Sequence, residues 1–403
     1  MNRSQPSDAG SDTAEESAHA EFERIDWDRI EESPPRPALE HVAFVVGLLA
    51  LCAVYLYHDR SGETYLVSRW IVGRADWLLL FSAVVLAAYG AVPLLRDPKR
   101  AVRLVGRLRR HPATALSLVF LAGVVVMALW ALLTDFRPDL TLQSFQPPVW
   151  DTVPYFTSQG DCVGRLAEGY DPERPCYGTW QFPLGTDRWG YGMIDLLLVG
   201  ARPIAYATIV ALGVIVPLAT GVGLVAGYYG GLVDDLLMAY VDIQLSVPAV
   251  VLYLIAFMFI LNSMFVFLVA FGLLSWGGIA RVVRSETLQR REEGYVLSAR
   301  AVGAPDRYVL RRHLLPNVTN TAVPAAFHLV AVIVLTEAGL SFLGFNVSFQ
   351  SWGMTVAEGL FNGPRTVVWW NSTFPAIALA LTVGAFKVVG DGLRDALDPR
   401  GEA

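Results

Sequence analysis

Few of the residues that could do chemistry lie in or beside the long apolar runs of this chain. Glu337 and His328 fall inside one run of about 20 apolar residues, Gln244 falls inside another, and Asn262 lies between two of them. Charge in hydrocarbon is costly, so these four residues are candidates for the lining of a polar pathway through a membrane. For Glu337 and His328, hydrogen bonding between helices is the competing interpretation, and we favour it because a pathway for varied solutes needs a weakly interacting surface.

Motifs for catalysis or nucleotide binding are missing. The sequence has no Gly-x-x-x-x-Gly-Lys-Ser/Thr loop that could cradle phosphates, no Gly-x-Ser-x-Gly turn and no His-Glu-x-x-His helix. No spacing of Cys and His suggests a metal site. We therefore predict that the chain is not an enzyme and has no catalytic residues. We also predict that it binds no metal or cofactor, and that it cannot hold ATP itself, so any energy from ATP would have to arrive through another chain.

Membrane helices are the elements that must position these residues. Of the 403 residues, 54% are hydrophobic and 17% are charged, against about 25% charged in a soluble domain. Eight apolar runs are continuous rather than alternating, which favours helices over a barrel. The predicted fold is therefore an all-α polytopic membrane protein. The runs lie near 41–57, 76–95, 113–134, 203–228, 236–260, 264–283, 321–345 and 374–393.

Basic residues are concentrated in two of the connecting loops. Residues 96–110 contain seven Lys and Arg, and residues 281–312 contain eight Arg. Short loops rich in these residues stay in the cytoplasm. With eight spans, both assignments agree, and they place both termini in the cytoplasm and the acidic loop 135–200 outside.

The first 40 residues are strongly acidic, with eleven Asp and Glu against four Arg. This composition is typical of a disordered, solvated arm, here on the cytoplasmic side. Binding of a partner and adaptation to a salty cytoplasm are the two alternatives for its charge.

The outer loop contains two of the three cysteines, Cys162 and Cys176. Disulfides persist outside the cytoplasm, so these residues are candidates for a disulfide, with two reduced thiols as the alternative. Cys52 falls in the first apolar run and is interpreted as a small apolar residue.

The segment 292–312 predicts a helix, a turn and a second helix in the large basic loop. The first helix stops at Gly303, a natural left-handed C-terminal position, and Pro305 can open the next helix. Such a protruding element can seat in a groove on a partner, or lie on anionic lipid as an ordinary basic loop. The residues expected to couple the chain to a partner are Ala299, Arg300, Ala301, Gly303, Ala304, Pro305, Leu315 and Pro316.

This segment resembles the EAA loop of ABC import permeases, whose pattern runs Glu-Ala-Ala, three residues, Gly, nine residues, Ile, one residue, Leu-Pro. Four positions are in register, namely Ala299, Gly303, Leu315 and Pro316. Three positions depart from it, with Leu297 for Glu, Ser298 for the first Ala and His313 for Ile.

Other motifs resemble those of the C-type permease subunits of the dipeptide, oligopeptide and nickel ABC importer family. They include Leu-Gly-Thr-Asp at 184–187, Gly-Ala-Arg at 200–202, Ser-Phe-Leu-Gly at 341–344, Ser-Trp-Gly at 351–353 and the closing segment 390–400. The resemblance covers about 113–400, and it implies a six-span permease domain at 111–403, with its coupling loop at 284–317. Two additional spans and a basic connector at 41–110 fall outside the usual layout.

The resemblance implies a permease subunit in the cell membrane that forms half of a translocation pathway for di- or oligopeptides, or for nickel or related solutes. Its implied partners are a homologous second permease, two cytoplasmic ATPases that hold ATP and Mg²⁺, an extracytoplasmic solute-binding protein and membrane lipid, but no nucleic acid.

Two rival functions are a secondary transporter driven by an ion gradient and a membrane-embedded enzyme. The first often shows an internal inverted repeat and charged coupling sites, neither of which stands out here. The second needs clustered His, Asp or Glu on facing helices, which the sequence lacks.

Overall fold

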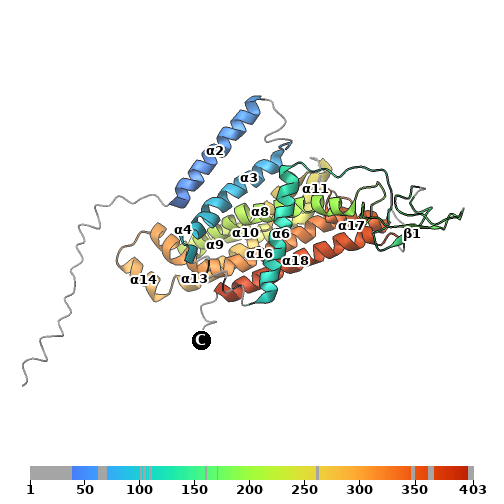
Figure 1. Cartoon of the computed structure of the whole chain (residues 1–403). Helices are drawn as coiled ribbons and strands as arrows, with labels where there is room; N and C mark the ends of the chain where they lie inside the picture. The colour runs from blue at the N-terminus through green and yellow to red at the C-terminus, as the bar shows by residue number, and fades with distance from the viewer. Residues whose placement is uncertain are drawn as a thin grey trace, which may run out of the picture.

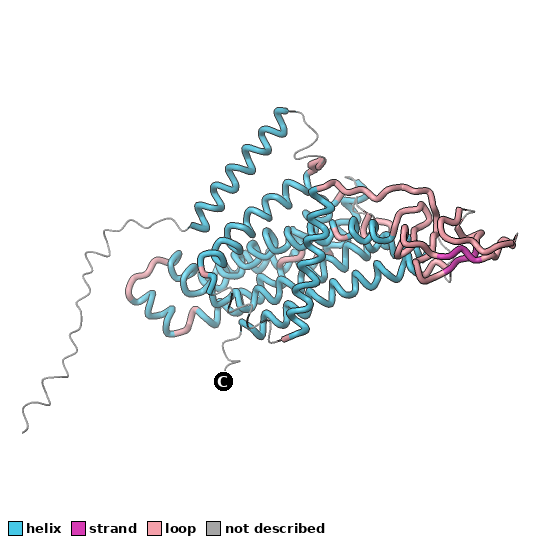
Figure 2. The backbone as a smooth tube through the Cα atoms, in the orientation of Figure 1, coloured by secondary structure: helices cyan, strands magenta, loops and turns pink. Residues whose placement is uncertain are grey.

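The computed structural model describes residues 39–61, 70–99, 102, 106, 108, 111–158, 161–169, 171–259, 263–345, 350–361 and 367–397. Within them the chain is a bundle of long helices, with one large irregular loop region at one end (Figure 2). The predicted acidic arm lies almost wholly outside the described residues, as does Asn262. The all-α prediction is confirmed.

Two helical segments precede the main bundle. The first is α2 (Leu39–Ser61), and the second is a continuous segment made of α3 (Arg74–Leu86), the π-helical turn η1 (Ala87–Ala91) and α4 (Val92–Arg96). We call these two segments the accessory pair.

The main bundle begins at Pro112, one residue after the predicted domain boundary. Its helices are α6 (Pro112–Leu133), α7 (Met193–Gly200), α8 (Arg202–Val210), η2 (Ala211–Ile215), α9 (Val216–Tyr229), α10 (Gly231–Ser246), α11 (Ala249–Phe259), α12 (Met264–Leu274), α13 (Gly277–Arg290), α14 (Gly294–Ala301), α15 (Asp306–Val309), η3 (Leu310–Leu314), α16 (Leu315–Phe342), α17 (Trp352–Phe361) and α18 (Trp370–Leu397).

Seven helical segments in the described residues are long and apolar enough to cross a membrane. The predicted fifth span, 236–260, is wrong as a single helix, because α10 and α11 meet at a bend of 67°. Pro248 has no N–H to continue the helix, and it disfavours helical geometry at Val247, whose ψ is 114°. If α10 and α11 are counted together as one broken span, the described residues contain eight candidate spans. The predicted fourth span is also longer than expected, since its helical segment starts at Met193.

Close approach of α9 to α13 depends on two glycines four residues apart. A Cβ at Gly223 would lie 2.5 Å from the carbonyl oxygen of Ala280, and one at Gly227 would lie 2.8 Å from that of Arg284. Small residues at this spacing let two helix backbones pack together within a membrane. This pair forms part of the scaffold beneath the basic loop.

The loop between α6 and α7 packs around a small hydrophobic core that it shares with α7 and the start of α18. Strands β1 (Thr152–Pro154) and β2 (Pro175–Tyr177) pair antiparallel, and a disulfide joins Cys162 to Cys176. The indole N–H of Trp370 donates to the carbonyl oxygen of Thr186 at 3.1 Å, which ties this loop to the start of α18. Figure 1 shows the loop at the opposite end of the bundle from α14.

The accessory pair docks on the main bundle through α3. Asp76, only 5% exposed, accepts hydrogen bonds from the hydroxyl of Tyr206 in α8 and from the indole N–H of Trp70. Farther along α3, Ser82 packs against Gly213, where a Cβ would meet the Ser82 carbonyl oxygen at 2.6 Å. No residue of α2 is buried in the chain. The buried contacts between the accessory pair and the bundle are therefore made by α3, whereas α2 meets the bundle through an exposed contact of His41 with Arg311.

Candidate functional site

The basic loop folds as the predicted helix, turn and helix. We call residues 294–317 the coupling element; it runs from α14 through a turn into α15, η3 and the first residues of α16. Gly303 has φ +82° in the turn, and Pro305 is the N-cap residue of α15. A left-handed glycine after one helix and a proline before the next are local signals, which is why the sequence predicted this shape.

The inner face of the coupling element is packed into the main core. Val296, Val309 and Leu314 are all 0% exposed, as is Val318 directly after the element. Burying an aliphatic side chain stabilises by about 1.5–3 kcal/mol. Four such anchors make the element move with the bundle rather than as an independent loop.

Polar contacts join the coupling element to the end of α9. The hydroxyl of Tyr228 donates to Asp306 at 2.6 Å, and the guanidinium of Arg300 lies 5.7 Å from the centre of the Tyr228 ring. Just before the element, Arg291 donates to the carbonyl oxygen of Gly227 at 3.0 Å. These contacts set the direction in which the turn projects.

The outer face of the coupling element combines apolar and basic side chains. Val302, in the turn, is 85% exposed, and Leu297 and Tyr308 are about half exposed. Arg300 and Arg307 flank them and are also exposed. An apolar tip on a fixed base, with charges beside it, is suited to seating in a groove on another protein.

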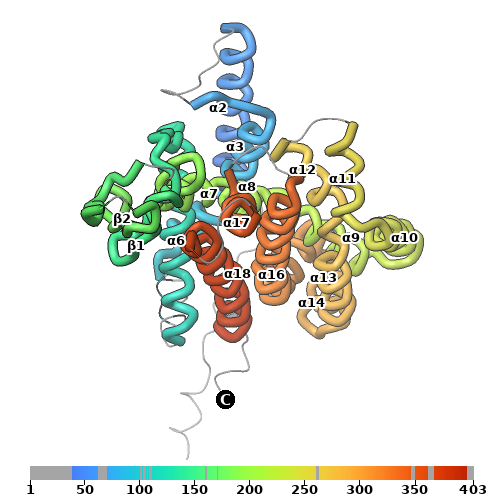
Figure 3. Tube along the Cα trace, turned by 90° about the vertical axis from the view of Figure 1, so that its right-hand side faces the viewer, coloured from blue at the N-terminus to red at the C-terminus, as the bar shows by residue number. Residues whose placement is uncertain are grey.

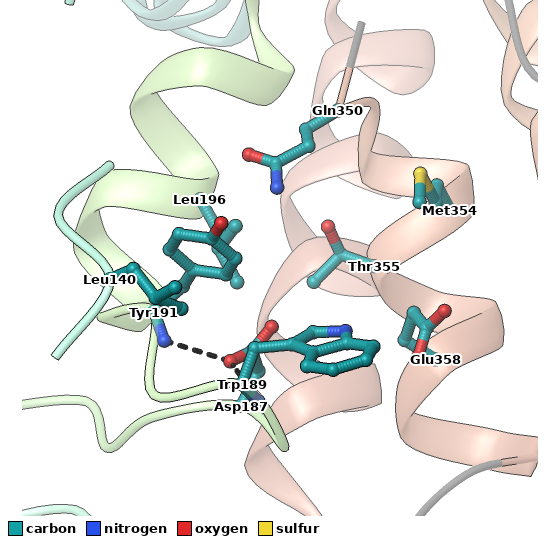
Figure 4. A pocket seen from close by; sticks show the side chains of 9 residues that line it. All are labelled: Leu140, Asp187, Trp189, Tyr191, Leu196, Gln350, Met354, Thr355 and Glu358. Carbon is teal, nitrogen blue, oxygen red and sulfur yellow. Dashed lines mark hydrogen bonds between the residues drawn. The ribbon is translucent and has the colours of Figure 1, made fainter. Parts of the chain in front are cut away.

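A second site lies at the other end of the bundle, between the outer loop and α17. It is a cavity of about 330 Å³, which we call the outer cavity (Figure 4). Its lining residues are Leu140, Asp187, Trp189, Tyr191, Leu196, Gln350, Met354, Thr355 and Glu358.

Asp187 is built into the wall of this cavity by a tight turn. Its Oδ1 accepts hydrogen bonds from the main-chain N–H groups of Trp189 at 2.9 Å and Tyr191 at 2.8 Å. Gly190, with φ +88°, completes the turn in a conformation that favours glycine. Burial raises the pKa of Asp187 to about 6; the main-chain N–H groups oppose this rise, and the negative charge of Glu358 adds to it.

Glu358 faces Asp187 from α17 on the opposite wall. Arg188 holds it in place, with Nε 2.9 Å from Glu358 Oε2, while the same guanidinium lies 4.4 Å from the centre of the Trp189 ring. The cavity therefore has carboxylates on two walls and aromatic rings nearby.

Comparisons with known proteins bear on both sites. Residues 219–402 match the family described as binding-protein-dependent transport system inner membrane component. The glutathione transport system permease protein GsiD of Pectobacterium atrosepticum is 32% identical over 78% of this chain and 97% of its own length. The oligopeptide transport system permease protein OppC of Bacillus subtilis is 33% identical over 73% of this chain and 88% of its own length. The chain belongs to this family.

Membership confirms the prediction of a multi-pass membrane permease of an ABC importer, and nothing favours the ion-driven alternative. It also agrees with the prediction that the chain is a transport component rather than an enzyme. The dipeptide transport system permease protein DppC of Bacillus subtilis is a further relative, 32% identical over 54% of this chain and 68% of its own length.

The structure brings the predicted coupling residues of this permease together at one end. Arg300, Ala301, Gly303 and Pro305 are exposed around the turn. Ala299, Ala304 and Leu315 are partly buried against the main core, and Pro316 lies exposed in the first turn of α16. The first four can touch a partner directly, whereas the buried ones support the element.

The predicted pathway residues are not gathered in one place. Gln244 is 1% exposed in α10, where its amide donates to the carbonyl oxygen of Leu273. Glu337 is 4% exposed in α16 and accepts a hydrogen bond from Ser341 at 2.9 Å. Gln244 bonds to a residue of another helix, α12, whereas this bond of Glu337 stays within α16. Hydrogen bonding between helices, which we favoured for Glu337, therefore stays a prediction.

His328 is different, because it lies exposed on α16. It lines a cavity of about 380 Å³ together with Lys387, Asp391 and Arg394 of α18. Charged groups on membrane helices almost always face water, protein or one another. This face of α16 and α18 therefore remains a candidate for the pathway.

Sequence reasoning missed the outer cavity as a site. The Leu-Gly-Thr-Asp motif at 184–187 served only as a family signature, and Glu358 was not singled out. The spacing Asp-x-x-Gly at 187–190 is a recognisable turn signal, but nothing local to it points to α17.

Proposed function

We propose that this chain forms half of the translocation pathway of a peptide importer and that the coupling element receives one of two cytoplasmic ATPase subunits. The observation that carries the proposal is the geometry of the element. Its inner face is anchored by side chains such as Val296 and Val309, both 0% exposed, while Val302 projects at 85% exposure. A buried base with an exposed apolar tip is what a contact that transmits force requires.

The proposed orientation places the coupling element in the cytoplasm. The first turn of α2 lies beside it, since His41 Nε2 contacts Arg311 Nη1 at 2.5 Å. The C-terminal end of α18 lies at the same end of the bundle (Figure 1). Both ends of the described chain thus emerge on the side of the basic loops, and the loop with the disulfide lies on the other side, outside the cell.

The coupling mechanism follows from the rigidity of the element. Closure of the ATPases on ATP would push the turn at Gly303, and the buried anchors would pass this motion to α13 and α16. A switch of this kind needs contacts that differ in strength between the inward- and outward-facing states. Hydrolysis would then reset the bundle, with ATP and Mg²⁺ held by the ATPases and no cofactor held by this chain.

The names of the relatives support a peptide as cargo. They are described as permeases for glutathione, oligopeptides and dipeptides. We propose di- or oligopeptides as the substrate class, delivered by an extracytoplasmic binding protein, with a homologous second permease completing the pathway. Nickel and related solutes remain the second candidate from the motif resemblance.

Site-directed cross-linking of the assembled transporter tests this proposal. Cys52 is the one free cysteine of the described residues, so a Cys52→Ser background carrying Val302→Cys places a single reactive thiol on the turn. We expect it to cross-link to a copurifying ATPase. The matched control is Leu343→Cys, because Leu343 is 68% exposed at the other end of α16. This variant should not cross-link to the ATPase. Cross-linking to the ATPase from Leu343→Cys alone would refute the assignment.

A further inference from the structure

The outer cavity contains two acidic side chains, of which Glu358 is engaged by Arg188. Asp187 and Glu358 place carboxylates on opposite walls, and in Figure 4 the Trp189 ring lies between them while the Tyr191 ring lies on the Asp187 side. We propose that this cavity binds the protonated amino group of the peptide cargo as it enters the permease. This inference rests on the peptide-import function proposed above.

The chemistry of the walls selects a cation. An ammonium group gains charge-assisted hydrogen bonds from carboxylates and attraction from the faces of aromatic rings. The Trp189 ring already accommodates a cation, since the guanidinium of Arg188 lies 4.4 Å from its centre. Arg188 itself is engaged by Glu358 through an ion pair of 2.9 Å. An entering ammonium is therefore directed to Asp187.

Asp187 is preorganised for this contact. The side chain is only 6% exposed, and the two main-chain N–H groups on Oδ1 hold it in one orientation. Figure 4 shows one carboxylate oxygen turned toward the Tyr191 nitrogen and the other turned into the space between the walls. Because the group is already fixed, binding loses little further side-chain entropy.

The size of the cavity indicates which part of a ligand it takes. Its volume of about 330 Å³ is at the lower end of the range for small-molecule sites, about 300–1,000 Å³. It can hold one end of a peptide, but not a folded surface. The amino terminus is the end that carries the positive charge.

Equilibrium binding to the complete transporter in lipid nanodiscs, without its binding protein, tests the proposal. The probes are radiolabelled dialanine and N-acetyldialanine, which lacks the charge. We expect the wild type to prefer dialanine by about tenfold or more. Asp187→Asn should abolish this preference, because asparagine keeps the Oδ1 acceptor of the turn and loses the charge. Glu358→Gln, on the opposite wall, should weaken it.

The matched control is Asp171→Asn in the same loop. Asp171 is exposed and its carboxylate also accepts a main-chain N–H, that of Glu173 at 2.8 Å. It should keep the wild-type preference. An unchanged preference in both Asp187→Asn and Glu358→Gln would overturn the proposal, as would equal binding of both probes to the wild type.

Uptake assays separate this inference from the proposed function. ATP-dependent uptake of dialanine and longer peptides is measured with the wild-type complex and its binding protein in liposomes. Absence of peptide uptake refutes the import function, whereas normal uptake with equal binding of both probes refutes only the cavity assignment. If Asp187→Asn weakens docking of the binding protein and leaves the dialanine preference intact, the cavity receives a basic side chain of that protein and the proposal is wrong.

Discussion

Replacement of Gly303 by arginine is expected to break the contact with the ATPase while the permease still folds and inserts. Gly303 has φ +82°, and a Cβ at this position would meet nothing within 4 Å. The intramolecular cost is therefore backbone strain alone, about 1–2 kcal/mol for a side chain in the left-handed region. Any larger effect must come from a second protein at the turn.

The arginine side chain should also weaken docking of the ATPase, in addition to straining the turn. Forcing extra atoms into a packed contact costs about 1–3 kcal/mol. A value of about 2 kcal/mol corresponds to an affinity lowered about 30-fold. Because force passes through this contact, transport should stop even when some ATPase stays bound.

Gly344 provides a closely matched control at the other end of α16. Its φ is +88°, and a Cβ there would also meet nothing within 4 Å. Gly344→Arg therefore has the same strain and the same free space, but it lies far along α16 from the coupling element. Gly303→Asn is a second control, since asparagine tolerates positive φ and is much smaller than arginine.

The assay compares ATPase copurification, ATP hydrolysis stimulated by the loaded binding protein, and peptide uptake in liposomes. Gly303→Arg should insert normally, copurify less ATPase and lose both stimulated hydrolysis and uptake, while Gly344→Arg should retain copurification. Normal uptake by Gly303→Arg would refute the coupling assignment. Equal loss of copurification in both arginine variants would show that strain, rather than docking, is responsible.

Three further outcomes are expected. Burial raises the pKa of Asp187 from 3.8 to about 6, so the charged form of this side chain destabilises the fold. The wild type should therefore lose stability between about pH 4 and 6. Over this range the free energy of unfolding of Asp187→Asn should rise relative to that of the wild type by at most about 3 kcal/mol. Asp76→Ala should leave the buried hydroxyl of Tyr206 without its acceptor, cost about 1–3 kcal/mol, and speed proteolysis between the accessory pair and the bundle. Replacing both Cys162 and Cys176 by serine should destabilise the outer loop by about 3 kcal/mol, seen as faster hydrogen exchange there.

Features encoded by a few neighbouring residues could be predicted well. By its backbone geometry Gly303 is suited to end one helix, and Pro305 is suited to begin the next. The structure has the turn at these residues. Pro248 carried a similar signal, but a count of apolar residues does not register a helix break. The broken α10–α11 pair was therefore predicted as one span.

Whether a polar residue within an apolar run is buried or exposed could not be predicted from its position in that run. Gln244, His328 and Glu337 looked alike as polar groups within spans, yet the first and third are buried and His328 is exposed. The direction of each helix face is set by its neighbours, and those neighbours are distant in sequence.

The sequence by itself therefore determined the number of apolar segments, the shape of the coupling turn and the family. These follow from hydropathy, backbone restrictions and short motifs, all of which act over a few residues. Only the tertiary structure brought Asp187 and Glu358 to opposite walls of one cavity. The ion pair between Arg188 and Glu358, which helps to form this site, joins residues that are 170 positions apart in the sequence. Such a site depends on how the outer loop packs against α17, and long-range packing has no signature in either segment alone.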